Sequence, residues 1–395
     1  MFSKRVEEMR PSPIRKFATH SEAARLAGKN VIPLNIGQPD IETPQAYFKA
    51  LASIEEQVIA YSPSEGIPEL REAFAAYFKK SGLPYEYDEL LITNGGSEAL
   101  LYAFAALCDD GDEIMMFEPF YSNYLSISQV IGAKVNPVPT DPENNYRIPS
   151  YEEIAMRVTP KTKAVIVTNP SNPTGLVLKA EEMETIKRVC VEFGLFLISD
   201  EVYREFTYDN AVFRSFAMYP ELLSRLIVID SVSKRFSACG VRVGCIATKN
   251  REFLSHVLKL CQSRLAVPFA EQIAAVSFFK ESEEEIEKVR LEYKARRDVC
   301  VEVLSQMKEI NFKTPEGAFY FILKLPVEDS DDFTGWLLSD FDVDGETIML
   351  CPANGCYVTE GGGKDEVRIS YCISQDKLRR AMVILEQGLR AYSRR

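Results

Sequence analysis

The sequence predicts an α/β protein with a large domain, built on a mainly parallel mixed sheet covered by helices, and a smaller α+β domain. In the middle of the 395-residue chain, short apolar runs alternate with helix-like segments, which is typical of strands buried on both faces. The C-terminal third instead combines a long charged helical stretch with isolated strands. We expect the large domain over residues 46–285. The small domain should combine the N-terminal arm with the C-terminal third, residues 1–45 and 286–395.

The predicted strands are short runs of apolar residues that end at polar or turn residues. In the large sheet they cover residues 90–93, 113–117, 164–168, 195–199, 226–230 and 244–248. Helices are expected between them, for example at 97–107 and 181–192. The small domain should contain a helix at 281–307, strands at 318–323 and 366–371, and a last helix from Gln375.

Composition and charge exclude several classes of function. Lys plus Arg is 46 and Asp plus Glu is 58, so the formal charge is −12. An acidic chain without a basic block is a poor ligand for nucleic acid or anionic membranes. We therefore predict no nucleic-acid partner and no membrane partner. Small molecules remain the expected ligands.

Cysteine and histidine usage favours a cytoplasmic protein without a metal site. The nine cysteines are scattered with no CxxC pair, and the chain has two histidines. This pattern fits neither a zinc site nor a secreted disulfide framework. Residues 1–10 are charged and lack the apolar core of a signal peptide, so we expect none.

A glycine-containing turn follows the predicted strand at 90–93. The sequence Thr93-Asn-Gly-Gly96-Ser97 leads into an apolar helix, for which Ser97 is the expected N-cap. Free backbone N–H groups in the first turn of a helix form a site for anions such as phosphate. Taken alone, this segment is more simply an ordinary turn between a strand and a capped helix.

Two further predicted strands are followed by polar side chains. Asp200 directly follows one strand, and Tyr203 lies three residues on. Lys234 follows another within Ser231-Val-Ser233-Lys234, where desolvation and nearby cations would lower its pKa and free its amine. Because ligands of open α/β sheets bind at the carboxyl ends of strands, these residues are expected to meet. Each alone is more simply a turn or capping residue.

Two other segments belong to the same predicted edge of the sheet. Asn172 lies in Asn169-Pro-Ser-Asn-Pro-Thr-Gly175, where two Asn-Pro steps fix an extended turn. Tyr121 follows the strand at 113–117 and is suited to stacking on a flat ring, although alone it would be assigned to the core. A carboxylate, a lysine, a rigid asparagine and a phosphate-type turn together are far more specific than any one of them.

These residues resemble those of the class I aminotransferases, within the class I/II family of fold-type I pyridoxal-phosphate enzymes. The strongest matches are Asn172-Pro-Thr-Gly, Asp200-Glu-Val-Tyr203 and Ser231-Val-Ser-Lys234. The ordered resemblance extends from Leu34 in the N-terminal region to Ser370. It implies an amino-acid aminotransferase that moves an amino group from an L-amino acid to a 2-oxo acid in a ping-pong reaction.

The resemblance also implies roles around pyridoxal 5'-phosphate. Lys234 is similar to the lysine that binds the cofactor covalently and moves the substrate α-proton. Asp200 resembles the carboxylate that pairs with the pyridine nitrogen and keeps it protonated. Tyr203 and Asn172 resemble donors to the ring oxygen, and Tyr121 the aromatic stacked on the ring. The expected phosphate ligands are Gly96, Ser97, Ser231 and Arg242, with Ser233 a weaker candidate.

Substrate binding and assembly follow from the same resemblance. Arg368 resembles the arginine that holds the substrate α-carboxylate in a bidentate pair, with Gly37 and Asn172 beside it. Tyr61 resembles the tyrosine that reaches the phosphate of a neighbouring subunit, which implies a homodimer with shared active sites. The chain offers no secure match for a second cation that would read an acidic side chain. Arg264 lies in the right neighbourhood of the sequence for such a cation, but it is not in clear register with the family pattern.

A second reaction is compatible with the same cofactor-binding residues. A carbon–sulfur β-lyase of the same fold would share the residues around Lys234, so elimination remains the main alternative to transfer. A cofactor-binding sensor would normally carry a DNA-binding region, and we expect none here. A nicotinamide-dependent dehydrogenase is disfavoured because no GxGxxG follows a first strand. The identities of the amino donor and the acceptor are not predicted.

Overall fold

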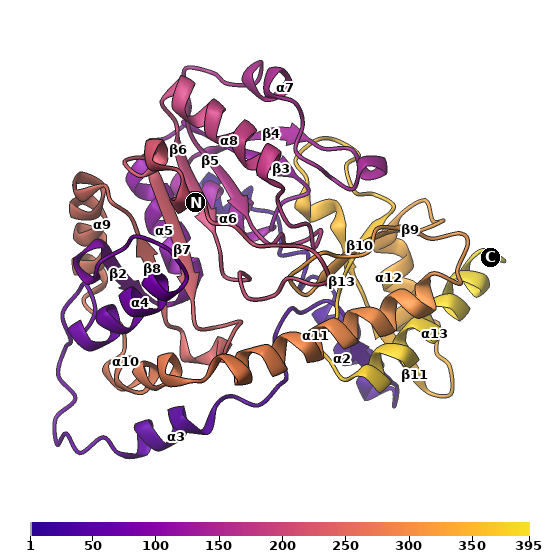
Figure 1. Cartoon of the computed structure of the whole chain (residues 1–395). Helices are drawn as coiled ribbons and strands as arrows, with labels where there is room; N and C mark the ends of the chain where they lie inside the picture. Colours follow the sequence, from indigo (N-terminus) through magenta and orange to yellow (C-terminus); the bar gives the residue numbers. More distant parts are fainter. Residues whose placement is uncertain (1) are drawn as a thin grey trace.

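The computed structural model describes residues 2–395 and contains a seven-stranded mixed sheet at its centre (Figure 1). The strand order is β2-β8-β7-β6-β5-β3-β4, and β8 alone runs antiparallel to its neighbours. The bounds are β2 Leu90–Thr93, β3 Glu113–Glu118, β4 Lys134–Pro139, β5 Thr162–Thr168, β6 Phe196–Asp200, β7 Leu226–Ser231 and β8 Gly244–Ala247.

Helices cover both faces of this sheet, as the near-continuous apolar strands predict. Ile198 and Ile229 point to one face, where they pack with residues of α5, α6 and α9. Leu197 and Val228 point to the other face, toward α4, α8 and α10. These helices are α4 Pro68–Lys80, α5 Gly95–Leu107, α6 Asn123–Ile131, α8 Ala180–Phe193, α9 Arg251–Arg264 and α10 Phe269–Ala275.

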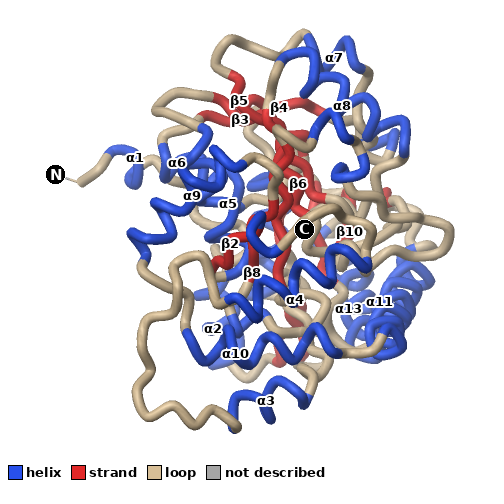
Figure 2. The backbone as a smooth tube through the Cα atoms, turned by 60° about the vertical axis from the view of Figure 1, so that its left-hand side comes forward, coloured by secondary structure: helices blue, strands red, loops and turns tan. Residues whose placement is uncertain are grey.

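A smaller α+β region lies beside the large sheet and contains the C-terminal end of the chain together with α2 and β1, whereas α1 packs against α6 of the large region. Its four-stranded antiparallel sheet has the order β12-β13-β10-β9, and β1 pairs in parallel with β11. The long helix α11 runs from the large sheet into this region and packs along α13 (Figures 1 and 2). The strands are β1 Asn30–Pro33, β9 Asn311–Phe312, β10 Tyr320–Lys324, β11 Glu346–Met349, β12 Cys351–Pro352 and β13 Glu366–Ser370; the helices are α2 Ala18–Leu26, α11 Glu283–Leu304, α12 Ser330–Ser339 and α13 Gln375–Tyr392.

Three short helices complete the fold: α1 Lys4–Glu7, α3 Gln45–Ala52 and α7 Tyr151–Ala155. Helix α3 packs against α10 at the edge of the molecule, and together with the chain that loops away after it forms a peripheral arm (Figure 1). Exposed apolar side chains gather on this arm, including Phe48, Val58 and Ile59. None of the helices in residues 2–395 is both long enough and apolar enough to cross a membrane.

The sequence-based fold class is confirmed, with three local corrections. Strand β4 was not predicted, because its two prolines and partly exposed residues hide the apolar pattern. Asp200 is the last residue of β6 rather than the residue after it. Helix α5 begins at Gly95 with Asn94 as its N-cap, so Ser97 lies inside the first turn and is not the cap. The predicted domain limits at residues 46 and 286 stay a prediction.

Candidate active site

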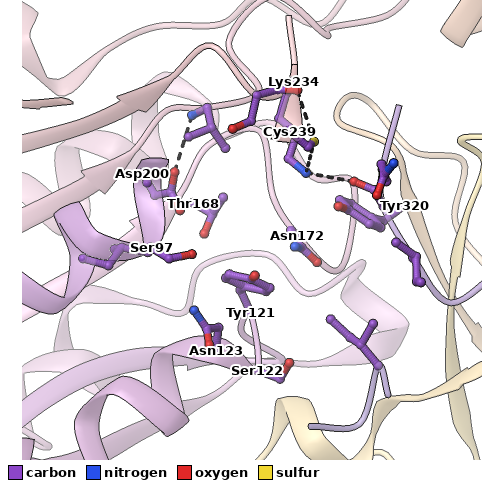
Figure 3. Close-up of a pocket in the computed structure, with 18 of the residues that line it drawn as sticks. Ser97, Tyr121, Ser122, Asn123, Thr168, Asn172, Asp200, Lys234, Cys239 and Tyr320 are labelled. Atoms are coloured by element: carbon purple, nitrogen blue, oxygen red, sulfur yellow. Dashed lines mark hydrogen bonds between the residues drawn. The ribbon is translucent and has the colours of Figure 1, made fainter. Parts of the chain in front are cut away.

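A cavity of about 480 Å³ opens at the carboxyl ends of the large sheet, between that sheet and the small α+β region (Figure 3). The turns after β2, β5, β6 and β7 contribute residues from one side, and β10, β13 and the N-terminal arm from the other. Every predicted site residue except Tyr61 lines it. These are Gly37, Gly96, Ser97, Tyr121, Asn172, Asp200, Tyr203, Ser231, Ser233, Lys234, Arg242 and Arg368.

One end of the cavity is formed by the start of α5. Gly95 has φ +74°, and a Cβ built on Gly244 of the neighbouring strand β8 would lie 2.9 Å from the backbone N of Gly96. Only glycine at 244 lets β8 pass this close to the turn. Arg242 closes the same end and donates from Nη2 to the Asn94 carbonyl at 3.0 Å. The N–H groups of the helix start and this guanidinium together suit a phosphate group.

Asp200 lies in the wall of the cavity with 4% of its surface exposed. Tyr124 donates its hydroxyl proton to Oδ2 at 2.8 Å, and the backbone N–H of Val202 approaches Oδ1 at 3.5 Å. Within residues 2–395, no cationic side chain forms a hydrogen bond or ion pair with this carboxylate. Burial therefore raises the pKa of Asp200 to about 6. A cationic ring nitrogen would complete the pairing of this carboxylate.

Lys234 projects into the same cavity from the turn after β7. Its Nζ donates to the Gly37 carbonyl at 2.8 Å and lies 3.9 Å from Sγ of Cys239 (Figure 3). Burial acts to lower the pKa of Lys234, but the neighbouring phenol of Tyr320 and the Cys239 thiol outweigh it, and the pKa is raised. This contradicts the lowered pKa expected from sequence, because that expectation counted nearby cations and overlooked these acidic neighbours.

Arg368 lines the cavity from β13 and is 2% exposed. Nη1 donates to Oδ1 of Asn172 at 3.1 Å, and Nη2 donates to the Asn35 carbonyl. Its Nε is buried without a hydrogen-bond partner among residues 2–395. Because Asn172 accepts through its oxygen, its amide N–H groups stay available to a ligand.

Several lining residues were not predicted from the sequence. Tyr320 lies beside Arg368, and Cys239 beside Lys234. Residues 12–15 of the N-terminal arm form another part of the wall, including Arg15. Cys239 lies in the same segment after β7 as Lys234, but Tyr320 and residues 12–15 come from segments that meet the strand ends only after the chain folds, so no local pattern marked them. Arg264 is bound instead to Glu98 and to the Ser64 carbonyl, and it lies outside this lining.

Comparisons with known proteins identify the family of this chain. The pattern of the family described as "Aminotransferase class I and II" matches residues 29–385. The chain belongs to this aminotransferase family. It is 34% identical to an aspartate aminotransferase of Pyrococcus abyssi, covering 98% of both chains, and 32% identical to aromatic-amino-acid aminotransferase 2 of Thermococcus litoralis, also covering 98% of both.

The fold agrees with solved aminotransferases as well. An aspartate aminotransferase of Thermus thermophilus, determined with maleate, superposes with a TM-score of 0.89 at 28% identity. The match covers 98% of this chain and 99% of that one. The protein is thus an aminotransferase of fold type I, and the residues lining its cavity can be tested against the cofactor that this family uses.

Pyridoxal phosphate fits the aminotransferase cavity on three observations. The buried carboxylate of Asp200 has no cationic partner among the described side chains, and the cofactor carries a basic ring nitrogen. The start of α5 and Arg242 offer donors for a phosphate at one end. Lys234 places a primary amine within the same cavity. The donor set and the cofactor therefore match in charge and in chemistry.

Tyr61 differs from the other predicted residues of this aminotransferase. It is 81% exposed on the peripheral arm, after α3, and it lies outside the cavity of its own chain. Its predicted contact with a phosphate requires a second subunit. That contact stays a prediction.

Proposed function

We propose that this aminotransferase binds pyridoxal phosphate through the predicted residues and transfers amino groups from L-amino acids to 2-oxo acids. The observation that carries the proposal is the position of Asp200. A buried carboxylate without a cationic partner shares one cavity with an amine and an anion-binding turn. When bound, pyridoxal phosphate supplies an electron sink for the charge left at the substrate Cα after proton loss.

Each residue of the cavity has a separate role in this proposal. Asp200 holds a proton at the ring nitrogen by its negative charge, and Tyr124 fixes the orientation of the carboxylate. Tyr203 and Asn172 donate to the ring oxygen, while Tyr121 stacks on the ring face. Lys234 attaches the cofactor and then carries the proton to and from the substrate Cα. The phosphate is held by Gly96, Ser97, Ser231, Ser233 and Arg242.

The substrate α-carboxylate is assigned to Arg368. This guanidinium is buried, and its unpartnered Nε shows that the donor set within the described chain is not fully used. Asn172 and the Asn35 carbonyl already hold its two other nitrogens, so its orientation is fixed before substrate arrives. Gly37, the residue predicted beside it, lines the same cavity, and its lack of a side chain leaves room for the Tyr320 hydroxyl.

Acidic amino acids are the substrate class that we favour. Arg15 is exposed on the N-terminal arm and lines the cavity near Ile14, which supplies the second cation that the sequence did not reveal. Several relatives are named aspartate aminotransferases, and the Thermus thermophilus structure holds maleate, a dicarboxylate. An arginine pairs with a second carboxylate in a way that a neutral side chain cannot provide.

We also propose a cytoplasmic homodimer. The arm with exposed Phe48, Val58, Ile59 and Tyr61 offers an apolar surface to a second copy, and Tyr61 would then reach the partner's phosphate site. All nine cysteines are free thiols, and all but Cys239 are buried, which suits a reducing compartment. Light scattering tests the assembly, and a fully active monomer would contradict it.

The decisive experiment is a panel of single-turnover half-reactions. The cofactor-loaded protein is mixed with aspartate, glutamate, alanine, phenylalanine or glutamine, and conversion of bound pyridoxal to pyridoxamine phosphate is followed by absorbance. Transfer gives one keto acid per site. An S-alkyl cysteine added to the panel tests the alternative, because elimination from it would release a thiol, pyruvate and ammonia. Arg15→Gln should slow aspartate and glutamate about tenfold or more and leave alanine and phenylalanine unchanged. Equal effects on all donors would exclude a side-chain role for Arg15.

A further inference from the structure

Tyr320 is a buried side chain of the cavity with no role assigned so far. It is the first residue of β10, pairs with Ser370 of β13, and is 2% exposed. Figure 3 shows it across the cavity from Asp200, near Lys234. Because β10 belongs to the small sheet, Tyr320 brings a group from that sheet to residues of the large one.

The two parts of the Tyr320 side chain contact different functional residues. The hydroxyl oxygen lies 2.7 Å from that of Tyr203, so the two share a hydrogen bond. It also occupies the space beside Gly37, where a built Cβ would lie 1.9 Å from it. The ring faces Arg368, whose Cζ lies 4.6 Å from the ring centroid. Tyr320 thus touches both a proposed cofactor donor and the proposed carboxylate-binding arginine.

The shared hydrogen bond has one direction once Tyr203 acts as a donor. A phenol carries a single proton, so a Tyr203 that donates to the ring oxygen of the cofactor can only accept from Tyr320. Hydrogen bonds in such a chain polarise one another, which makes Tyr203 a stronger donor. A stronger donor stabilises negative charge on the ring oxygen.

The ring makes an independent contribution. Arg368 is buried, and its guanidinium has only Asn172 and a backbone carbonyl as polar partners in the described chain. The negative face of an aromatic ring attracts a guanidinium most strongly where water is excluded. The Tyr320 ring therefore helps to keep Arg368 in the orientation that a substrate carboxylate requires.

We propose that Tyr320 is a positioning residue with two separable roles: its hydroxyl strengthens the Tyr203 donor, and its ring orients Arg368. This inference rests on the proposed function, because it takes Tyr203 as a cofactor ligand and Arg368 as the carboxylate ligand. In this proposal, a single side chain of the small sheet connects the substrate-binding end of the cavity with its cofactor-binding end.

Two substitutions separate the roles. Tyr320→Phe removes the hydroxyl and keeps the ring, whereas Tyr320→Leu removes both. Tyr208→Phe is the matched control, because that buried tyrosine donates to the Ala318 carbonyl at 2.6 Å and lies outside the cavity lining. All three variants lose one buried phenolic hydrogen bond in the same part of the protein.

Two measurements that need no turnover test the hydroxyl role and the ring role separately. The first is the pH at which the absorbance of the bound cofactor changes. The second is the dissociation constant for maleate and for 3-phenylpropionate, carboxylates that cannot transfer an amino group. We expect Tyr320→Phe to raise the spectroscopic pKa by about half a unit to one unit, with carboxylate binding within about twofold of wild type. Tyr320→Leu should raise that pKa similarly and weaken both carboxylates about 5- to 30-fold.

The outcomes distinguish the possible failures. An unchanged spectroscopic pKa in Tyr320→Phe overturns the hydroxyl role, even if Tyr320→Leu does not fold. Equal carboxylate binding by the Phe and Leu variants overturns the ring role. The same shifts in Tyr208→Phe would mean general loosening and overturn both. A wild-type protein with no cofactor absorbance band would instead refute the proposed function itself.

Discussion

Asp200 and Asp230 lie at the carboxyl ends of the neighbouring strands β6 and β7, yet their electrostatic surroundings are opposite. Asp230 is fully buried, forms an ion pair with Arg235, lies 3.7 Å from Arg204 and accepts the Ser231 N–H at 2.7 Å. Asp200 is nearly as buried but has only Tyr124 and a backbone N–H. Two carboxylates of the same type at the same sheet edge are thus satisfied in different ways.

The pleat of the sheet explains the difference. Asp200 lies opposite Ile229 in the register of β6 and β7, so the next residue, Asp230, points to the other face. Asp200 therefore faces the cavity, while Asp230 faces the packed side under α4, where Arg204 and Arg235 lie. The chain supplies cations to the carboxylate that serves the fold. In the proposed function, the Asp200 carboxylate is left to pair with a cation of the ligand.

Substitution of Asp200 should give the largest loss of activity among these variants. Asp200→Asn keeps the shape but cannot hold a proton at the ring nitrogen by charge. We expect the single-turnover rate of α-proton removal to fall about 10³-fold or more, measured by stopped-flow absorbance with a good amino donor. A cofactor-loaded variant within tenfold of the wild-type rate would contradict the role given to Asp200.

Substitution of Asp230 should affect stability instead. Asp230→Asn leaves Arg235 and Arg204 buried with less compensating charge, so we expect the free energy of unfolding to fall by about 3–5 kcal/mol in urea titrations. Glu221→Gln is the control, because it breaks an exposed pair with Lys187 and should cost less than about 1 kcal/mol. A loss for Asp230→Asn as small as that of the control would mean that its cations are satisfied elsewhere.

The pH dependence of stability also distinguishes Asp200 from Asp230. Burial raises the pKa of Asp200 from 3.8 to about 6. The folded cofactor-free protein therefore binds a proton at this carboxyl more tightly than the unfolded chain does. The corresponding stability is present below about pH 4 and is lost as the pH rises through 6, a change of about 3 kcal/mol. Cofactor-free Asp200→Asn should therefore be more stable than wild type at pH 8, and the two should converge at pH 4. A difference that is independent of pH would contradict the assigned cause.

The smallest expected effect concerns Tyr124, whose side chain is hydrogen-bonded to Asp200. Tyr124→Phe removes the 2.8 Å donor to Oδ2 and keeps the ring that packs on Phe104 and Tyr121. Losing a hydrogen bond to a charged group should weaken cofactor binding by about 1.5 kcal/mol, or about tenfold, measured as a dissociation constant at neutral pH. Tyr208→Phe is the control. Unchanged affinity would show that Asp200 needs no such support.

The cofactor side of the cavity could be predicted from sequence because its residues are local to strand ends. Asp200 ends β6, and Lys234 follows β7 within a few residues, so an apolar run and the polar residues after it are enough to find them. The face to which Asp230 points could have been inferred from the same alternation. Its arginine partners could not, because they lie in turns whose path depends on the packed fold.

The substrate side was harder to predict. Tyr320 and Arg15 reach the cavity from a strand of the small sheet and from the N-terminal arm, and neither segment carries a local signal for this position. Strand β4 was missed because Pro137 and Pro139 interrupt its apolar pattern. Prolines are tolerated there because β4 is the edge of the sheet and pairs only with β3. The contact predicted for Tyr61 depends on a second chain and stays a prediction.

The N-terminal arm has a practical consequence for anyone who handles this protein. Residues 12–15 form part of the cavity wall, and they are anchored on both sides: the Asn35 side chain donates to the Ile14 carbonyl at 2.7 Å, and Phe17 is buried against Leu338 and Met349. We expect a deletion that removes these residues to disturb the part of the wall in which we propose that Arg15 binds the donor side chain. Helix α13 packs against α11, away from the cavity lining, so a fusion at the C-terminus is the safer choice for substrate profiling.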